Sequence, residues 1–306
     1  MAIVRRTWVE ASLDPARKVR APRGRTSGVR AARTIMLAVC RCYSSLVTVD
    51  SDTAILVRIE RAVAQNLLDY ARAVQSVAPE VQAETTACAS GVAAFTGIGS
   101  PLTTIKGAGP DIPDDDIDAT EAFFQKRSVK QIVFELAPWI PGRSVERLLR
   151  RGYRVAGVED VVVRSQPFDA PMPSRPVAPV SAEEWPALQM AVNDAPDTPV
   201  WSAIIRATAQ VREAIRLGVR DESGQWIACA ELFPVGDVAL FANDATLKSA
   251  RGRGAQTATI HHRLREVAAC GFVCVAAEVA PGSTSERNYL RCGFQLLYAR
   301  SHYVRG

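Results

Sequence analysis

A segment from the middle of the chain is repeated, without a gap, close to the C-terminal end of the chain. Residues 144–164, SVERLLRRGYRVAGVEDVVVR, align with residues 285–305, SERNYLRCGFQLLYARSHYVR, at an offset of 141 positions. This alignment places Gly152 on Gly293 and Leu149 on Leu290. Just upstream, with a two-residue adjustment, ELAP at 135–138 matches EVAP at 278–281. Because the same order of strand, helix and strand surrounds both segments, the sequence predicts two copies of one fold.

Length and charge agree with two folded units that follow a basic tail. The chain has 306 residues, 48% of them hydrophobic, which is enough for two ordinary domains with their own cores. Residues 1–42 contain ten Lys and Arg against Glu10 and Asp14, a balance of +8, so the net charge of +5 leaves −3 for the other 264 residues. A mildly acidic folded part does not suggest nucleic acid as its partner.

The basic tail itself has three interpretations. The first 35 residues are rich in Arg and poor in acids, without an apolar core. That composition fits a transit-type leader, a disordered nucleic-acid tail, or a translated upstream region with the true start at Met36, and we favour the last. The most apolar stretch, residues 34–49, is interrupted by Arg41 and is too short to span a bilayer, so we expect no membrane partner.

The cysteine and histidine content points away from metal chemistry. The seven cysteines show no disulfide-framework spacing, and no second pair completes a zinc site with Cys270 and Cys274. Free or buried thiols in a reducing compartment are the simpler interpretation, so we expect a cytoplasmic protein without a metal.

Hydrophobic periodicity and Gly and Pro punctuation divide the remaining chain. Apolar residues recur at helical spacing from Ile55 to Val74, which predicts a long helix. Other helices are expected at 118–127, 143–152, 181–192, about 255–269 and 284–293. Strands are expected at 81–88, 90–99, 101–109, 130–137, 153–164 (as a strand or a hairpin), 225–233, 238–247, 272–280, 294–300 and 302–305.

The domain plan follows from these segments and from a proline-rich stretch between the halves. Prolines at 167, 171, 173, 176 and 179 indicate an extended linker. We therefore predict a basic tail at 1–49, a first domain at 50–165, a linker at 166–179 and a second domain at 180–306.

One loop of the second half has the composition of an anion site. In ARGRGAQTATI, residues 250–260, Gly252 and Gly254 permit a tight turn that exposes backbone N–H groups. The helix expected from Ala255 or Gln256 adds a partial positive charge, and Arg251 and Arg253 add full charges. Because a strand leads into this loop and a helix leaves it, an anion site is favoured over a solvated turn.

The second half resembles the GNAT superfamily of N-acetyltransferases. That family has Arg/Gln-x-x-Gly-x-Gly/Ala before its central helix, and Arg251 and Gly254 match the first two fixed positions. Gln256 stands where the family has Gly or Ala, which is a departure. Tyr289 lies four residues before Gly293-Phe294, as the family's tyrosine does. The resemblance covers about 175–306, and the first half shares it only through the internal repeat.

This resemblance implies a fold, a cofactor and site residues. The fold would be α/β (α+β), with two GNAT-like domains that each have a mostly antiparallel central sheet and helices on both faces. One acetyl-CoA would bind as co-substrate in the second half. Its binding residues would be Thr246, Leu247, Arg251, Gly252, Arg253, Gly254, Ala255, Gln256 and Thr257. Tyr289 would be the general acid that protonates the departing thiolate, because a phenol is protonated at working pH.

The two halves can also be compared with each other. Before its short helix the first half carries Asp114, Asp115, Asp116 and Asp118, whose charges would repel a pyrophosphate, so it is expected to be structural or substrate-shaping. Glu278 has a counterpart in Glu135, which favours a structural role for both. Asp237, Asp244 and Glu231 remain candidates for the general base, and the sequence does not rank them.

The expected function is transfer of an acetyl or other acyl group from CoA to an amine or hydroxyl of a small-molecule or protein acceptor, by direct attack on the thioester. A non-catalytic CoA-binding or interaction module with the same fold is the alternative. Nucleic-acid binding through the basic tail is a third and weaker interpretation.

Overall fold

The computed structural model describes residues 51–193, 198–211 and 213–306. The basic tail and the proposed start at Met36 lie outside the described residues. The described helices are α3 (Ser51–Val77), α4 (Asp114–Gln125), α5 (Gly142–Arg150), α6 (Trp185–Asn193), α7 (Pro199–Gln210), α8 (Ala255–Ala268) and α9 (Thr284–Arg291), with short 3-10 turns at η1 (Pro79–Val81) and η2 (Lys248–Ala250). None of them is both long and apolar enough to cross a membrane.

The strands form one mostly antiparallel sheet. They are β1 (Glu84–Cys88), β2 (Gly91–Phe95), β3 (Thr104–Lys106), β4 (Ile132–Leu136), β5 (Arg154–Ser165), β6 (Val177–Pro179), β7 (Ile215–Arg220), β8 (Trp226–Val235), β9 (Val238–Thr246), β10 (Cys274–Val279) and β11 (Gln295–Arg305). Their order across the sheet is β1-β2-β3-β4-β11-β5-β10-β9-β8-β7-β6. The predicted class, two copies of a sheet with helices on both faces, is confirmed.

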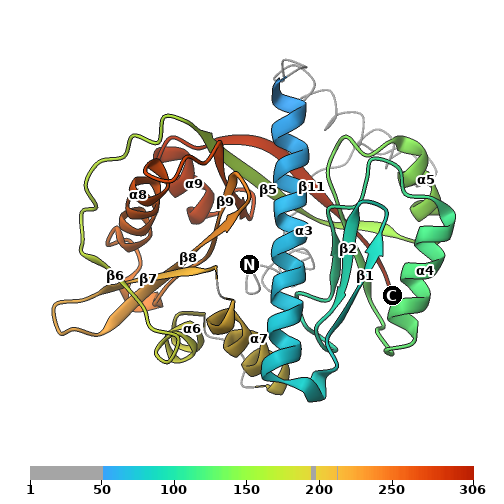
Figure 1. Ribbon diagram of the computed structural model, residues 1–306, viewed down its shortest axis with the longest axis horizontal. Coiled ribbons are helices and arrows are strands. Elements are labelled where there is room, and N and C mark those ends of the chain that lie inside the picture. Colours follow the sequence, from blue (N-terminus) through green and yellow to red (C-terminus); the bar gives the residue numbers. More distant parts are fainter. Residues whose placement is uncertain (1–50, 194–197, 212) are drawn as a thin grey trace, which may run out of the picture.

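The last strand of each half joins the sheet of the other half. β11 pairs with β4 of the first half, and β5 pairs with β10 of the second half. β5 and β11 also pair with each other along most of their lengths. Figure 1 shows these two long strands crossing behind α3 from one half to the other. The halves therefore share backbone hydrogen bonds and are joined by more than the connecting segment.

The pairing of β5 with β11 follows the sequence repeat residue by residue. Glu159 is opposite Arg300, and the offset of 141 maps each of these residues onto the other. The other pairs obey the same rule: Val163 opposite Gln295 maps onto Val304 opposite Arg154. Even the two bulges correspond, because the register skips one residue after Leu296 and one after Val155. A pseudo-twofold axis thus passes between Glu159 and Arg300.

The repeated helix ends also have the same geometry. Gly152 and Gly293 both have positive φ, at 87° and 82°, which an L side chain rarely adopts. The following amides, of Tyr153 and Phe294, donate to the carbonyls of Leu148 and Tyr289. The match at these two glycines therefore reflects one helix-stop motif used twice.

α3 lies between the two halves. Its apolar stripe is buried as the spacing predicted, with Ile59, Leu67 and Val74 each at most 2% exposed. They belong to a core that includes residues of β5, β8, β9, β10 and α7. In Figure 1 this helix stands upright, with β1, β2, α4 and α5 on one side and β8, β9, α8 and α9 on the other. α3 is therefore placed to shape a site in the second half.

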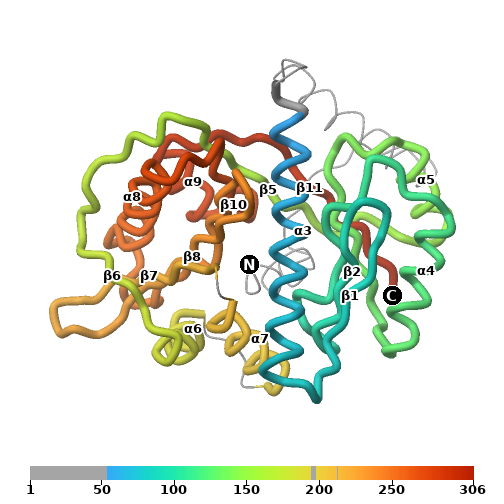
Figure 2. The backbone as a smooth tube through the Cα atoms, viewed as in Figure 1, coloured from blue at the N-terminus to red at the C-terminus, as the bar shows by residue number. Residues whose placement is uncertain are grey.

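Several elements differ from those expected. α7 and β7 were missing from the sequence prediction, and the expected strands 294–300 and 302–305 form one bulged strand, β11. The segment after β5 runs along the outside of the second half, as Figure 2 traces. Its last three residues form the edge strand β6. Prolines suit this edge because they lack the N–H that a central strand needs.

Candidate functional site

The site begins where two neighbouring parallel strands of the second half separate. β9 and β10 pair from Val238 and Cys274 only as far as Phe241 and Ala277, although β9 continues to Thr246. At the point of separation, Asn243 and Asp244 of β9 are together opposite Ala230 of β8. Asn243 has a φ of 53°, so this is a bulge with a left-handed residue. The bulge turns β9 away from β10 and opens a gap between them.

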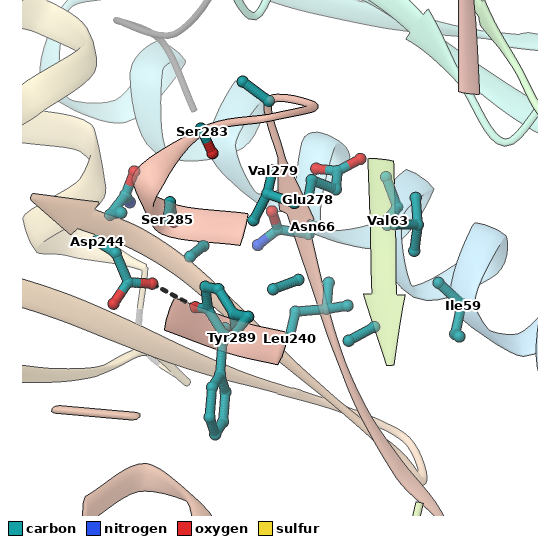
Figure 3. A pocket seen from close by; sticks show the side chains of 17 residues that line it. Ile59, Val63, Asn66, Leu240, Asp244, Glu278, Val279, Ser283, Ser285 and Tyr289 are labelled. Atoms are coloured by element: carbon teal, nitrogen blue, oxygen red, sulfur yellow. Dashed lines mark hydrogen bonds between the residues drawn. The ribbon is translucent and has the colours of Figure 1, made fainter. Parts of the chain in front are cut away.

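A pocket of about 110 Å³ occupies this gap. Residues from both faces of the sheet line it, including Tyr289 and Ser285 of α9 on one face and Ile59, Val63 and Asn66 of α3 on the other. Figure 3 shows Asn66 and Tyr289 reaching the same space from the two sides. The arrangement allows two molecules to approach the gap from opposite faces of the sheet.

The equivalent place in the first half is filled by a side chain. Glu135 corresponds to Glu278 in the repeat, so the preceding residues Phe134 and Ala277 also correspond. Phe134 pairs with Ile105 of β3, and Ala277 pairs with Phe241 of β9. The next residues along these two strands, Lys106 and Ala242, therefore occupy equivalent positions. The Lys106 ammonium reaches Glu135 at 3.2 Å and Glu278 at 2.8 Å. Ala242 has only a methyl group and leaves the space open. The small side chain of Ala242 therefore adds to the space that the bulge of β9 opens in the second half.

The predicted anion loop forms a turn that exposes backbone N–H groups at the start of a helix. Gly252 and Gly254 have φ of +75° and +78°, and Gly254 caps α8. None of the backbone N–H groups from Gly252 to Thr257 donates to another described residue; the first bond of the helix is from Ala258 N to Gly254 O. Residues 251–254 are exposed. A row of free donors at a helix N-terminus favours an anion.

The other predicted loop residues have structural partners. Leu247 N donates to Ile227 O, and Arg251 Nε donates to Thr246 O at 3.3 Å. Gln256, the departure from the family pattern, directs its side chain to α9, where it bonds Ser285 and Asn288 at 2.8 and 2.6 Å. Its side chain therefore ties α8 to α9 and leaves the loop unobstructed.

Sequence reasoning missed a third arginine at this loop. Arg175, in the segment predicted as a linker, donates from Nε to the carbonyl oxygen of Arg253 at 2.7 Å. The Oγ of the preceding Ser174 lies 3.7 Å from where a Cβ on Gly254 would be. A basic residue in a proline-rich stretch carries no signal of this contact, because the stretch lies far from the loop in sequence.

Tyr289 is buried and hydrogen-bonded at the pocket. Its hydroxyl donates to Asp244 Oδ2 at 2.5 Å, and Arg263 Nη2 approaches the same hydroxyl at 3.4 Å. Arg263 also pairs with Asp244 Oδ1 at 2.5 Å. Burial, and then the charge of Asp244, raises the pKa of Tyr289 well above its usual value. The phenol is thus protonated at any working pH, and its ring also packs edge-on against Phe294.

The other candidate bases occupy three different environments. Asp237 pairs with Arg58 and does not line the pocket. Glu231 also lies outside the lining; its carboxylate contacts Tyr70 at 3.3 Å and Arg216 at 3.3 Å. Glu278 does line the pocket but is held by Lys106 and Arg300. Burial alone would raise the pKa of Glu278, yet these two cations outweigh it and the pKa is lowered, which supports the structural interpretation.

Glu231 should make the stability of the protein depend on pH. Burial raises its pKa from 4.5 to about 7, although Asn243 and Arg216 oppose the shift. Between these two values the folded state binds the proton more tightly than the unfolded chain does, so this contribution to stability falls as the pH rises. The free energy of unfolding should decrease from pH 5 to pH 8 in the parent. In Glu231→Gln we expect this decrease to be smaller by about 2 kcal/mol, as measured by urea denaturation at the two pH values. Exposed Glu184→Gln is the control, and an unchanged slope for Glu231→Gln would contradict the raised pKa.

The counterpart of the anion loop in the first half is closed. The first turn of α4 carries Asp114, Asp115 and Asp116, and the preceding loop is packed against α3 and Ile140. A Cβ on Gly109 would lie 2.3 Å from Ile140 Cδ1. Both the charge and the packing therefore disfavour a phosphate at this position.

A buried charge cluster lies on the pseudo-twofold axis beside the pocket. Its members are Glu60, Lys106, Glu135, Glu159, Glu278 and Arg300. Ligand atoms of Glu135, Glu159 and His302 lie within 4.8 Å of one another, as in a metal site. The carboxylates already have cationic partners, however, since Lys106 is 3.2 Å from Glu135 and Arg300 is 3.2 Å from Glu159. The cluster therefore holds the two halves together through ion pairs.

Comparison with known proteins gives likeness of structure only. No family model and no curated protein matches the sequence. Among solved structures, a GCN5-related N-acetyltransferase from Kribbella flavida superposes with a TM-score of 0.57 at 17% identity, over 77% of this chain and 95% of that one. A GCN5-related N-acetyltransferase from Sphaerobacter thermophilus gives 0.50 at 14% identity, over 62% and 66%. With one strand, loop and helix order present twice in a single sheet, this protein has the GCN5-related N-acetyltransferase (GNAT) fold in tandem.

Proposed function

We propose that the protein transfers an acetyl group from acetyl-CoA to an amine or hydroxyl acceptor by direct attack on the thioester. The observation that carries this proposal is the pocket between the diverging strands β9 and β10. One of its lining residues, Ser285, is bonded by Gln256 of the first turn of α8, the helix whose N-terminus has free N–H donors. The first half, for which we retain the boundaries 50–165, completes the sheet and supplies α3 to the pocket.

The loop residues fit the pyrophosphate of a CoA ester. Backbone N–H groups from Gly252 to Thr257 are without acceptors in the described part of the chain, and Arg251, Arg253 and Arg175 add positive charge. The space around Gly252 is open, since a Cβ built there would meet nothing within 4 Å, so the approach to these donors is clear. Bound CoA ester would supply the activated acyl group.

The residues at the pocket can manage the protons of this reaction. A nucleophile that attacks the thioester loses a proton, and the departing thiolate gains one. Tyr289 is the group that we assign to protonate the thiolate, and the adjacent Arg263 stabilises the phenolate that remains. Asp244 accepts a hydrogen bond from the phenol and lines the pocket, so of the candidate bases it is the one placed to take up the proton that the nucleophile loses and to pass it to the Tyr289 phenolate.

Release of free thiol from acetyl-CoA in the presence of a panel of amines and alcohols tests this function. Turnover that depends on an acceptor supports it. The alternative, a CoA-binding module without catalysis, predicts that the protein binds acetyl-CoA tightly and releases thiol no faster than buffer with every acceptor.

The Gly254 position gives a separate test of the anion loop. Gly254→Val places a β-branched side chain at a φ of +78°, where it strains the turn and narrows the approach to the N–H groups. We expect the dissociation constant of CoA to rise by about tenfold, which corresponds to more than ~1 kcal/mol, with one site per chain in calorimetric titration.

A matched control is Gly224→Val. Gly224 has a similar φ of +84° in the turn between β7 and β8. A Cβ there would meet nothing within 4 Å, whereas a Cβ on Gly254 would make only an ordinary contact with Ser174 Oγ at 3.7 Å. It shares the backbone strain but lies away from the loop. If Gly254→Val binds CoA like the parent, or if two CoA molecules bind per chain, the loop assignment is wrong.

A further inference from the structure

One polar side chain that lines the pocket has no hydrogen-bond partner among the described residues. Asn66 of α3 is 7% exposed, lines the pocket, and makes no hydrogen bond to any described residue through its amide. Its neighbours along the same face, Val63 and Leu67, are buried apolar residues. No atom of the Asn66 amide is among the fully enclosed, unpartnered polar atoms of the described residues, so the amide is open to the pocket and can bond a ligand that enters it.

Asn66 enters the pocket from the side opposite to the CoA loop. Tyr289 and Ser285 come from α9, on the face that also carries α8 and its N-terminal loop. Asn66 comes from α3, which belongs to the first half of the chain and covers the other face. A molecule bound to Asn66 therefore meets the reacting end of a CoA ester across the gap between β9 and β10.

The charges around the pocket limit what this molecule can be. The two carboxylates in the lining are Asp244 and Glu278, and both are paired with buried cations. The remaining lining is mostly aliphatic, from residues such as Ile59, Val63 and Leu240. An ammonium or a carboxylate in this space would be desolvated without an opposite charge that is free to pair with it, so a neutral group is favoured.

The volume of the pocket also limits the size of the groups that can react in it. About 110 Å³ is room for roughly four water-sized groups. That space holds an acetyl group together with an amino nitrogen and the first carbons that it bears. An amine in its neutral form must direct its lone pair at the thioester, so its N–H groups need acceptors on the other side. The Oδ1 of Asn66 is such an acceptor.

We propose that Asn66 binds and orients the acceptor, and that the acceptor is a small primary monoamine with an uncharged, apolar substituent. This inference rests on the proposed acetyl transfer. The first half of the chain would then contribute to acceptor specificity, because Asn66 lies on α3.

The experiment compares the parent with Asn66→Leu, which keeps the size and removes the hydrogen bond, and with Gln65→Leu as the matched control. Gln65 is the adjacent amide on α3, bonds Asp69 at 2.8 Å and does not line the pocket. The probes are butylamine, 1,4-diaminobutane and glycine, with acetyl-CoA as donor. Thiol release gives KM and kcat, and ligand-observed NMR gives butylamine binding with and without CoA.

We expect Asn66→Leu to raise both the KM and the dissociation constant for butylamine by about tenfold, as for loss of one hydrogen bond, and to leave CoA binding unchanged. Gln65→Leu should match the parent. Butylamine should be preferred over the diamine and over glycine, each of which brings a second charge.

Three results would overturn the role of Asn66: equal butylamine binding by Asn66→Leu and the parent, no butylamine binding by the parent, or preference of the parent for a doubly charged acceptor. Each of these can occur while acetyl-CoA binding and turnover with another acceptor persist. Failure of the parent to bind acetyl-CoA would instead remove the proposed transfer, and NMR binding of butylamine without cofactor still tests Asn66 in that case.

Discussion

Replacing Arg300 with Met should lower the free energy of unfolding by about 3–5 kcal/mol, because it leaves buried carboxylates without their cation. Arg300 is fully buried and pairs with Glu60 at 2.6 Å, with Glu159 at 3.2 Å and with Glu278. Of the cations in the described part of the chain, only Lys106 would remain paired with carboxylates of this set, namely Glu159 and Glu278. Urea denaturation at pH 8 measures the loss.

The controls separate charge from packing. Arg300→Lys keeps the charge and should lose less. Arg305→Met, on the same strand, removes a partly exposed arginine that pairs with Glu121, and it should cost about 1 kcal/mol or less. Equal losses for Arg300→Met and Arg305→Met would contradict the importance of the cluster.

The same variant should also be less impaired in acid. Burial, and then the nearby charge of Glu278, raises the pKa of Glu159 to about 7 even with Arg300 present. Without Arg300 the carboxylates of the cluster hold their protons more strongly, and protonation removes the uncompensated charge. The difference between Arg300→Met and the parent should therefore shrink from pH 8 to pH 5.

The repeat made much of the fold predictable, because it recorded a local motif that folds the same way twice. Gly152 and Gly293 stop equivalent helices, and the strands that follow them have the register that the offset requires. The exchange of β5 and β11 was not predictable in this way. A repeat specifies what each strand looks like, whereas the sheet that it joins depends on contacts across more than a hundred residues.

The site was predictable only where its functional residues are consecutive in the sequence. The loop from Arg251 to Thr257 has its signal in consecutive glycines and arginines. The pocket depends on Ala242, a residue without functional groups, whose meaning appears only beside its counterpart Lys106. Asn66 did leave a signal, since it is a polar residue within the apolar stripe of α3, but the stripe alone does not tell what the residue faces.

The second large effect is expected for Tyr289→Phe, which should lower kcat about 100-fold. General-acid catalysis typically contributes 100- to 10,000-fold, and a thiolate is already a fair leaving group, so the lower end applies. The variant keeps the ring that packs against Phe294 and removes only the hydroxyl. CoA affinity should stay the same, because the loop lies on separate residues.

The structure also supplies a rival explanation, which the kinetics can distinguish. The Tyr289 hydroxyl bonds Asp244 in the resting site, so its loss could act by displacing Asp244 and Arg263. A purely structural effect would lower the melting temperature. It would also decrease kcat by the same factor for acyl donors whose thiols differ in acidity. If Tyr289 is the general acid, the decrease in kcat caused by Tyr289→Phe should instead become smaller as the leaving thiol becomes more acidic. The thiolate is then a weaker base and leaves more readily without a proton. Parent-like turnover by Tyr289→Phe with intact CoA binding would make Tyr289 a core residue and leave protonation to water or another group.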